Sequence, residues 1–141
     1  MLKRIGLLTS DTQMMTVSIW REEENDGRFE DYQVPARENQ TVLDVVAYVQ
    51  QHIDTTLSYR FACRVGMCGS CAMMVNGAPR WTCRTHVSKV VTDDRLEVGP
   101  LRNLPVIKDL ATDMDPFFEK WVAAEAVFHP CLLYTSDAAD E

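Results

Sequence analysis

The first patterned part of the chain alternates between hydrophobic and polar positions. Residues 16–21 place a valine and an isoleucine on one face, and residues 29–34 form a second alternating run. The polar stretch between them ends in the turn sequence Asn-Asp-Gly at 25–27. Two alternating runs joined by such a turn predict a β-hairpin.

A period of three to four residues replaces the alternation after residue 40. Apolar side chains follow this helical spacing at Val42, Val45, Val46, Val49 and Ile53. Thr41 stands where an N-cap belongs, and Asp44 follows it three residues later, as in a capping box. The sequence therefore predicts an amphipathic helix that packs on the hairpin.

The pattern loses its periodicity between residues 59 and 71 and then returns to short strands. Residues 72–75 and 78–82 flank Asn76 and Gly77, the pair that two-residue type I′ hairpin turns prefer. This arrangement predicts a second hairpin, whose far strand leads directly into Cys83.

The remaining elements complete a fold class. Residues 96–98 predict one more strand, residues 106–107 an extended edge segment, and residues 117–127, which follow a proline, a second helix. Two hairpins, a crossing helix and further short strands predict an α+β fold, with the helix on one face of a mixed sheet.

The composition is that of a folded protein without a nucleic-acid footprint. Of the 141 residues, 46% are hydrophobic and 25% are charged, which separates the chain from disordered sequences. The formal net charge is −7 and no basic patch stands out, so we expect no nucleic-acid partner. No export signal and no membrane-spanning run is visible, so any membrane association must come through a partner.

Four cysteines carry the strongest chemical signal. They are Cys63, Cys68, Cys71 and Cys83, separated by four, two and eleven residues. The first three have the spacing of plant-type ferredoxins, in which one loop wraps an iron-sulfur cluster and a distant cysteine completes the ligand set. Glycines at 66 and 69 let such a loop curl around the inorganic core, and Ser70 adds a hydroxyl donor. The four thiolates predict one [2Fe–2S] cluster.

Other uses of four cysteines suit the sequence less well. A disulfide framework is disfavoured, because no secretion signal is present and intracellular thiols stay reduced. Structural zinc is the stronger rival, but its ligands usually come as two close pairs, and only Cys68 and Cys71 form such a pair. His86 follows Cys83 by three residues, but four cysteines already complete a cluster, so we expect a loop or surface position for it.

The residues around the cysteines resemble a known family. The stretch YRFACRVGMCGSCAMMVNG at 59–77 and the CRT at 83–85 are similar to the N-terminal domain of the iron-sulfur subunit of succinate dehydrogenase and fumarate reductase. The segments PLRNLPVIKDL at 100–110 and FFEKW at 117–121 match that family too, and the resemblance covers about residues 16–130. Free plant-type ferredoxins are similar only in the first three cysteines and place the fourth much farther on.

The resemblance implies a β-grasp, [2Fe–2S] ferredoxin-like fold with the start of a helical second domain. In such complexes a flavoprotein subunit with covalently held FAD oxidises succinate or reduces fumarate. The cluster would relay electrons between that flavin and the [4Fe–4S] and [3Fe–4S] clusters of the second domain, near a quinone held with membrane-anchor subunits. The chain would then be cytoplasmic, peripheral on the inner face of the cell membrane through its partner subunits.

We expect four parts along the chain. Residues 1–15 are disordered or precede the true start, residues 16–105 form the [2Fe–2S] domain, and residues 106–130 cross into a truncated helical domain. Residues 131–141 resemble the translation of a transposon-derived adapter used in preparing sequencing libraries, which would make the fifth cysteine, Cys131, foreign to the natural protein.

Two rival functions stay open on the sequence. A stand-alone ferredoxin for another reductase would have a compact end and no need of the extension at 104–121. A zinc-stabilised interaction module would be colourless, whereas a [2Fe–2S] protein is red-brown. The chain shows no nucleophile-and-base pair and no phosphate loop, so we expect a carrier that is not catalytic alone.

Overall fold

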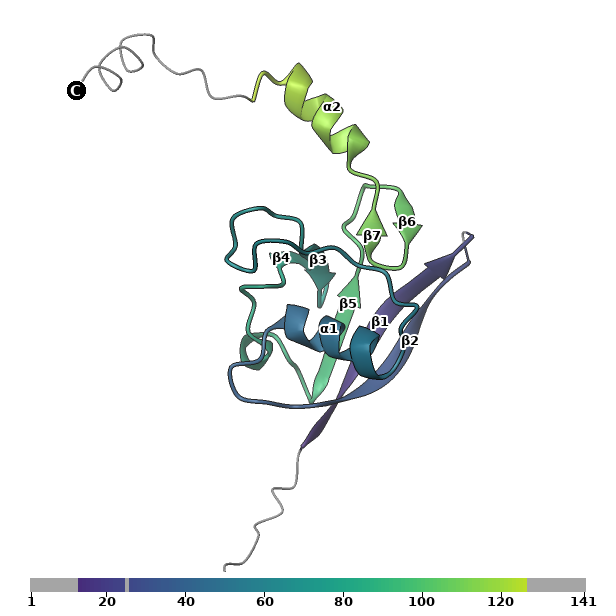
Figure 1. Cartoon of the computed structure of the whole chain (residues 1–141), viewed down its shortest axis with the longest axis vertical. Helices are drawn as coiled ribbons and strands as arrows, with labels where there is room; N and C mark the ends of the chain where they lie inside the picture. Colours follow the sequence, from purple (N-terminus) through teal and green to yellow (C-terminus); the bar gives the residue numbers. More distant parts are fainter. Residues whose placement is uncertain (1–12, 25, 127–141) are drawn as a thin grey trace, which may run out of the picture.

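A computed structural model describes residues 13–24 and 26–126, which form a five-stranded mixed sheet crossed by one helix (Figure 1). The strands are β1 (Met14–Glu23), β2 (Asp26–Pro35), β3 (Ala72–Val75), β4 (Ala78–Trp81) and β5 (Arg95–Gly99). Their order is β2-β1-β5-β3-β4, and β1 pairs with β5 in parallel while the other neighbours are antiparallel. The α+β prediction is confirmed.

The β1–β2 hairpin forms as predicted but begins earlier. Its first strand starts at Met14 rather than Thr16, because Met15 pairs with Val34 and is only 3% exposed in the core. The expectation that residues up to 15 lie outside the folded part is therefore wrong for two residues. Residues 1–12 lie outside the described residues.

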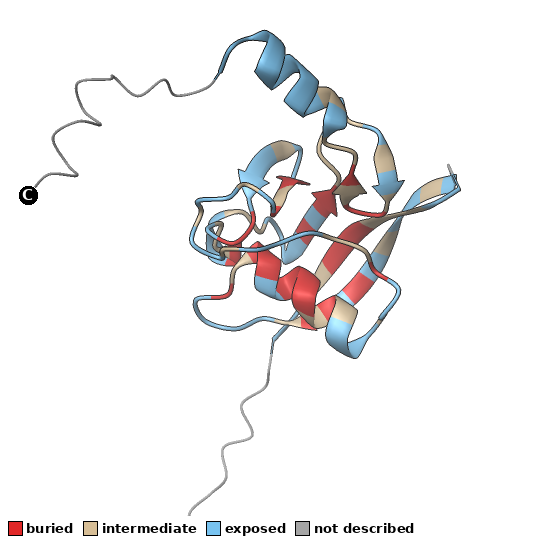
Figure 2. Cartoon of the chain, turned by 45° about the horizontal axis from the view of Figure 1, so that its top comes forward, coloured by how far each residue is buried: buried red, intermediate tan, exposed pale blue. Residues whose placement is uncertain are grey.

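Helix α1 (Val42–His52) covers one face of the sheet, and the core lies between them (Figure 2). The predicted capping box is present: the Asp44 N–H donates to Thr41 Oγ1 at 3.2 Å, and the Thr41 N–H donates to Asp44 Oδ2 at 3.0 Å. The four predicted valines are fully buried, whereas Ile53 is the C-cap residue and stays exposed.

The second hairpin has the predicted turn. Asn76 and Gly77 have φ of 45° and 78°, and type I′ turns require positive φ at both central positions. The Asn76 side chain also accepts a hydrogen bond from the Glu97 N–H at 2.8 Å, which ties the turn to β5. The hairpin is thereby fixed to the middle of the sheet, and the 3-10 turn η1 (Val87–Lys89) follows it.

The chain continues past the sheet into a small hairpin and a second helix. The hairpin consists of β6 (Val106–Lys108) and β7 (Ala111–Thr112), and helix α2 (Asp115–Ala123) follows it. Helix α2 has no buried residue, and it begins and ends earlier than the predicted 117–127. Of the helices in the described residues, none is long and apolar enough to cross a membrane. The predicted division at residue 105 stays a prediction, and residues 131–141 lie outside the described part.

Candidate metal centre

The structure brings the four predicted cysteines together from two segments. Cys63 and Cys68 lie in the loop before β3, Cys71 directly precedes that strand, and Cys83 lies in the turn after β4. The Cys68 N–H lies 3.4 Å from Cys63 Sγ, and the Cys83 N–H lies 3.5 Å from Cys71 Sγ. A negative charge on Cys63 also raises the pKa of Cys83. The sulfurs therefore form one group made of two pairs.

The loop between Cys63 and Gly69 turns its backbone N–H groups inward. Three of them approach the Cys63 Sγ atom, at 3.3 to 3.4 Å. The donors are Val65, Met67 and Cys68. Left-handed backbone at Arg64 and Gly66, with φ of 56° and 76°, gives the loop this curl. Successive N–H groups that face one point form an anion-binding nest.

Gly66 meets a steric demand as well as a conformational one. A Cβ atom at this position would lie 2.8 Å from Cγ of Arg84, whose segment also carries Cys83. Gly69 has a φ of 72°, but a Cβ there would meet nothing within 4 Å. The expectation that glycines let the loop curl is met at both positions, and only Gly66 also permits close approach of the second segment.

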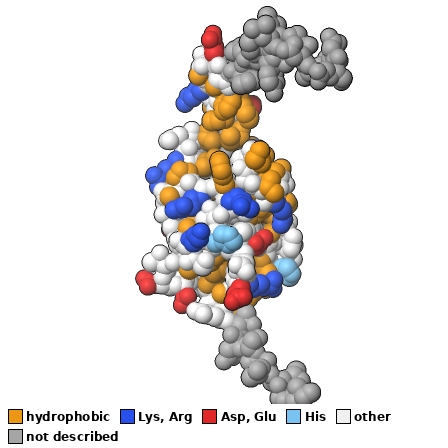
Figure 3. Space-filling view, turned by 90° about the vertical axis from the view of Figure 1, so that its left-hand side faces the viewer, with side chains coloured by type: hydrophobic (Ala, Val, Ile, Leu, Met, Phe, Trp, Pro, Cys, Tyr) orange, Lys and Arg blue, Asp and Glu red, His pale blue; other side chains and the backbone are white. Residues whose placement is uncertain are grey.

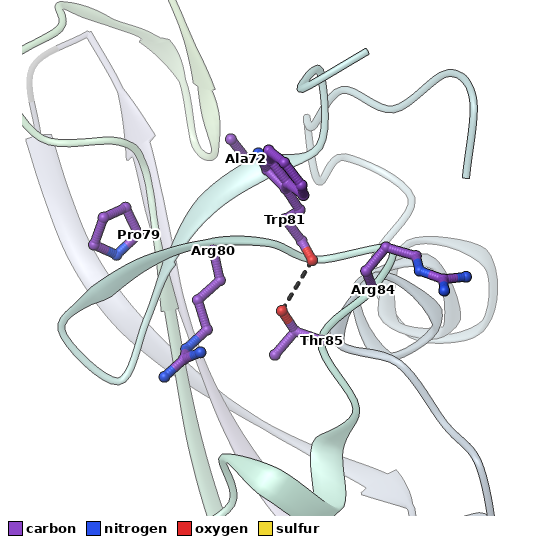
Figure 4. Close-up of a pocket in the computed structure, with 6 residues that line it drawn as sticks. All are labelled: Ala72, Pro79, Arg80, Trp81, Arg84 and Thr85. Atoms are coloured by element: carbon purple, nitrogen blue, oxygen red, sulfur yellow. Dashed lines mark hydrogen bonds between the residues drawn. The ribbon is translucent and has the colours of Figure 1, made fainter. Parts of the chain in front are cut away.

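The turn after β4 fixes the position of Cys83. The Thr85 hydroxyl donates to the Trp81 carbonyl at 2.9 Å (Figure 4). The Arg84 N–H donates to the same oxygen at 3.0 Å. The Thr82 hydroxyl donates to the Cys71 carbonyl at 2.7 Å. These bonds hold the two buried cysteines side by side, and the Cys83 N–H lies 3.5 Å from Cys71 Sγ.

The two pairs differ in their electrostatics. Hydrogen bonding by the Ser70 hydroxyl, together with N–H groups, lowers the pKa of Cys68 to about 6. The N–H groups of the nest lower the pKa of Cys63 as well. Burial, followed by the neighbouring Cys71 thiol, raises the pKa of Cys83 above its ordinary value. Cys68 is exposed, whereas Cys71 and Cys83 are only 3% and 7% exposed.

The arrangement of the cysteines in two pairs fits a two-iron cluster. Among residues 13–24 and 26–126, no group of three or more His, Cys, Asp or Glu side chains is placed to hold one metal ion. A [2Fe–2S] cluster takes two thiolates on each iron, and N–H groups directed at the sulfurs stabilise its negative charge. The two thiol pairs and the nest therefore fit that group.

The face around the loop combines apolar and basic side chains. Figure 3 shows the side of the molecule that carries the loop, where Lys and Arg side chains stand beside hydrophobic ones. Met67 is 83% exposed and Trp81 56% exposed, and the Arg64 guanidinium lies 4.7 Å from the centre of the Phe61 ring. The predicted donor Ser70 is in place, and His86 lies in the loop before η1, as expected.

Sequence reasoning missed Leu43. This residue is 1% exposed and packs with Cys71 and Cys83 in a small cluster apart from the main core. It lies one position outside the apolar stripe by which the helix was predicted. An apolar residue beside such a stripe was the available signal that α1 has a second buried side.

Comparison with known proteins places this site in a family. Residues 16–119 match the family described as the 2Fe-2S iron-sulfur cluster binding domain. The chain belongs to this family. The resemblance noted in the sequence is thereby confirmed for the domain, and the cysteine loop lies within the matched residues.

Three relatives show where members of this family occur. The fumarate reductase iron-sulfur subunit of Mycobacterium tuberculosis is 40% identical over 111 residues, which cover 78% of this chain and 44% of that protein. The mitochondrial succinate dehydrogenase [ubiquinone] iron-sulfur subunit of Dictyostelium discoideum is 34% identical over 91 residues, 64% of this chain and 32% of that protein. A chain of the solved Mycobacterium smegmatis Sdh1 complex in the apo form aligns with a TM-score of 0.74 at 34% identity, covering 84% of this chain and 48% of its own length. This chain spans less than half the length of these relatives.

Proposed function

We propose that this 2Fe-2S domain holds one cluster on Cys63, Cys68, Cys71 and Cys83. Its function is to relay electrons between an FAD-containing subunit and further iron-sulfur clusters of a succinate dehydrogenase or fumarate reductase complex. The observation that carries the proposal is the pairing of Cys63 with Cys68 and of Cys71 with Cys83, beside a loop whose N–H groups face Cys63 Sγ.

The bound cluster would supply reversible one-electron chemistry, and the chain's own residues divide the remaining tasks. Cys71 and Cys83 anchor the site to the core, because both are buried against Leu43. The nest donates hydrogen bonds to sulfur, which stabilises the added charge of the reduced state. Cys68 lies at the exposed edge, which leaves the short path that electron exchange with a partner needs.

The partners follow from the relatives rather than from the site itself. The proteins that this chain resembles are named as subunits of fumarate reductase and succinate dehydrogenase. We therefore include a flavoprotein subunit with FAD as the direct partner in the proposal. Membrane-anchor subunits and quinone would be reached through a further domain with [4Fe–4S] and [3Fe–4S] clusters, and they would hold the protein at the inner face of the membrane.

The test of the cluster is anaerobic purification of the full chain, followed by absorbance, electron paramagnetic resonance, and iron and sulfide analysis. We expect a red-brown protein with about two iron and two sulfide ions per chain. Cys131→Ala is the matched control, because it removes a cysteine outside the proposed ligand set and should leave the iron content unchanged. A colourless protein that contains zinc and no sulfide would overturn the proposal.

The test of the partner uses the same protein. A flavoprotein subunit of succinate dehydrogenase, reduced with succinate, should bleach the visible absorbance of the cluster. Cys68→Ala should remove the response because no intact cluster remains. Rapid reduction by a ferredoxin reductase, with none by the flavoprotein subunit, would instead support a stand-alone ferredoxin.

A further inference from the structure

A buried carboxylate lies at the turn of the β6–β7 hairpin, outside the loop that carries the cysteines. Asp109 is 1% exposed, and both of its oxygens are used. Oδ1 accepts from Nε of Arg21 and from the N–H of Glu22, each at 3.0 Å, and Oδ2 accepts from the N–H of Ser58 at 2.9 Å. Asp109 therefore connects three segments: the β6–β7 hairpin, strand β1 and the stretch that follows α1.

The negative charge of Asp109 is paired with the guanidinium of Arg21. Arg21 also donates to Asp54, Tyr32 and Thr56, and its side chain is 11% exposed. Burial alone would lower the pKa of Arg21, but its hydrogen bonds to Asp54 and Asp109 raise it above the ordinary value. A buried ion pair of this kind is costly to break, because the remaining partner is left uncompensated.

The β6–β7 hairpin also forms hydrogen bonds with the segment that leads into the cysteine loop. In addition to the bond from Ser58 to Asp109, the Leu110 N–H donates to the Ser58 carbonyl at 3.1 Å. The Arg60 guanidinium donates to the Thr112 carbonyl at 2.9 Å. Three hydrogen bonds thus join residues 58–60 to residues 109–112, and Cys63 follows three residues after Arg60.

We propose that Asp109 is a positioning residue for the iron-sulfur loop, holding residues 58–60 so that Cys63 and the nest stay in register with the buried cysteines. The inference rests on the proposed function, because the group to be positioned is the proposed cluster. Its physical basis is that residues 59–63 belong to no strand or helix of the structure. Their approach to the site is set by these hydrogen bonds and by packing of Tyr59 on the core.

Asp109→Asn tests the inference with little change in shape. Asparagine keeps the size of the side chain and tolerates the left-handed backbone at this position, where φ is 51°. Its NH2 group, however, cannot accept a hydrogen bond, so one of the three N–H donors loses its partner. Asp93→Asn is the matched control, because Asp93 has a similar φ of 50° and is exposed.

The measurement is hydrogen exchange of the full chain, followed by mass spectrometry, together with the half-life of the cluster absorbance in the presence of a chelator. In Asp109→Asn we expect peptides that cover residues 57–71 to exchange about tenfold faster, as one unpaired buried donor would cause. The cluster half-life should shorten by a similar factor. Asp93→Asn should leave both quantities unchanged.

A second variant guards against general loss of stability. Arg60→Met removes the bond to Thr112 from an exposed side chain, so the fold should persist while exchange at residues 57–71 still rises, to a smaller extent. Faster exchange confined to β1 and the β6–β7 hairpin, with unchanged loop exchange and cluster half-life, would overturn the inference. If the wild-type chain holds no cluster, the proposed function fails, and the exchange data still decide whether Asp109 positions the loop.

Discussion

The two pairs of cysteines lie in different environments. Cys63 and Cys68 lie in an open loop, surrounded by N–H and hydroxyl donors, and their pKa values are lowered. Cys71 and Cys83 lie against Leu43 at the ends of two strands, and the pKa of Cys83 is raised. The difference separates two requirements of an electron carrier. The buried pair provides attachment to the fold, and the pair in the loop provides stabilisation of charge near the surface.

Removal of the cysteines should separate these roles most strongly. Alanine at any of the four positions should abolish the [2Fe–2S] absorbance, because one of the two irons then lacks a thiolate. In cluster-free protein, however, Cys71→Ala and Cys83→Ala should also lower the free energy of unfolding, by about 1 kcal/mol, since each leaves a cavity. Cys63→Ala and Cys68→Ala should change it by less than about 0.5 kcal/mol. Urea unfolding gives the values, and equal losses for all four would contradict the comparison.

Alkylation should expose the electrostatic difference in cluster-free protein. The thiolate is the reactive species, and it is populated only above the pKa of the thiol. The rate at Cys68 should therefore fall as the pH is lowered through about 6, while Cys83 should react roughly a hundredfold more slowly at pH 7. Iodoacetamide labelling with mass spectrometry measures both rates. If the alkylation rate of Cys68 were half-maximal only at a pH near the ordinary cysteine pKa, the proposed role of its hydrogen-bond donors would be refuted.

Substitution of the glycines should show how closely the cysteine loop approaches the segment that carries Cys83. Gly66→Ala and Gly69→Ala each force a side chain into left-handed backbone, at a cost of about 1–2 kcal/mol. Gly66→Ala adds a clash with Arg84, from the segment that carries Cys83, so it should shorten the cluster half-life more than Gly69→Ala. Thermal unfolding and visible absorbance test this order. The reverse order would mean that the loop does not press on the second segment.

The smallest effect should come from the Ser70 hydroxyl. Ser70→Ala removes the leading hydrogen-bond contribution that lowers the pKa of Cys68 and should lower the midpoint potential by roughly 40 mV, equivalent to one hydrogen bond of about 1 kcal/mol. Ser88→Ala, at an exposed position in η1, is the control and should leave the potential unchanged. Redox titration followed by absorbance measures the shift, and an unchanged potential in Ser70→Ala would argue against this role.

The parts of the molecule that the sequence predicted depend on local rules. Alternation around a turn predicted the β1–β2 hairpin, and the capping box at Thr41 predicted the start of α1. The Asn76-Gly77 pair predicted a type I′ turn, which has the required positive φ values. The cysteine spacing predicted the group of four thiols. Each of these signals lies within about twenty residues.

The parts that the sequence did not predict depend on long-range contacts. Nothing in the neighbours of Asp109 marks it as buried, because its partners Arg21 and Ser58 come from segments far away in the chain. The burial of Met15 likewise depends on the full length of β2, and the place of Leu43 depends on where two later segments deliver their cysteines. The difference in burial and pKa between the two cysteine pairs was not predicted either, because it also depends on long-range contacts.

The parallel pairing of β1 with β5 orders events during synthesis of the chain. Strand β5 lies between β1 and β3, yet it is the last of the five strands to be made. The central sheet therefore stays incomplete until residue 99 has been added, whereas all four cysteines have already been made by residue 83. Pairing across so long a loop is slow. The nascent chain thus presents its thiols to iron, to oxidants and to one another before the fold that buries two of them is complete.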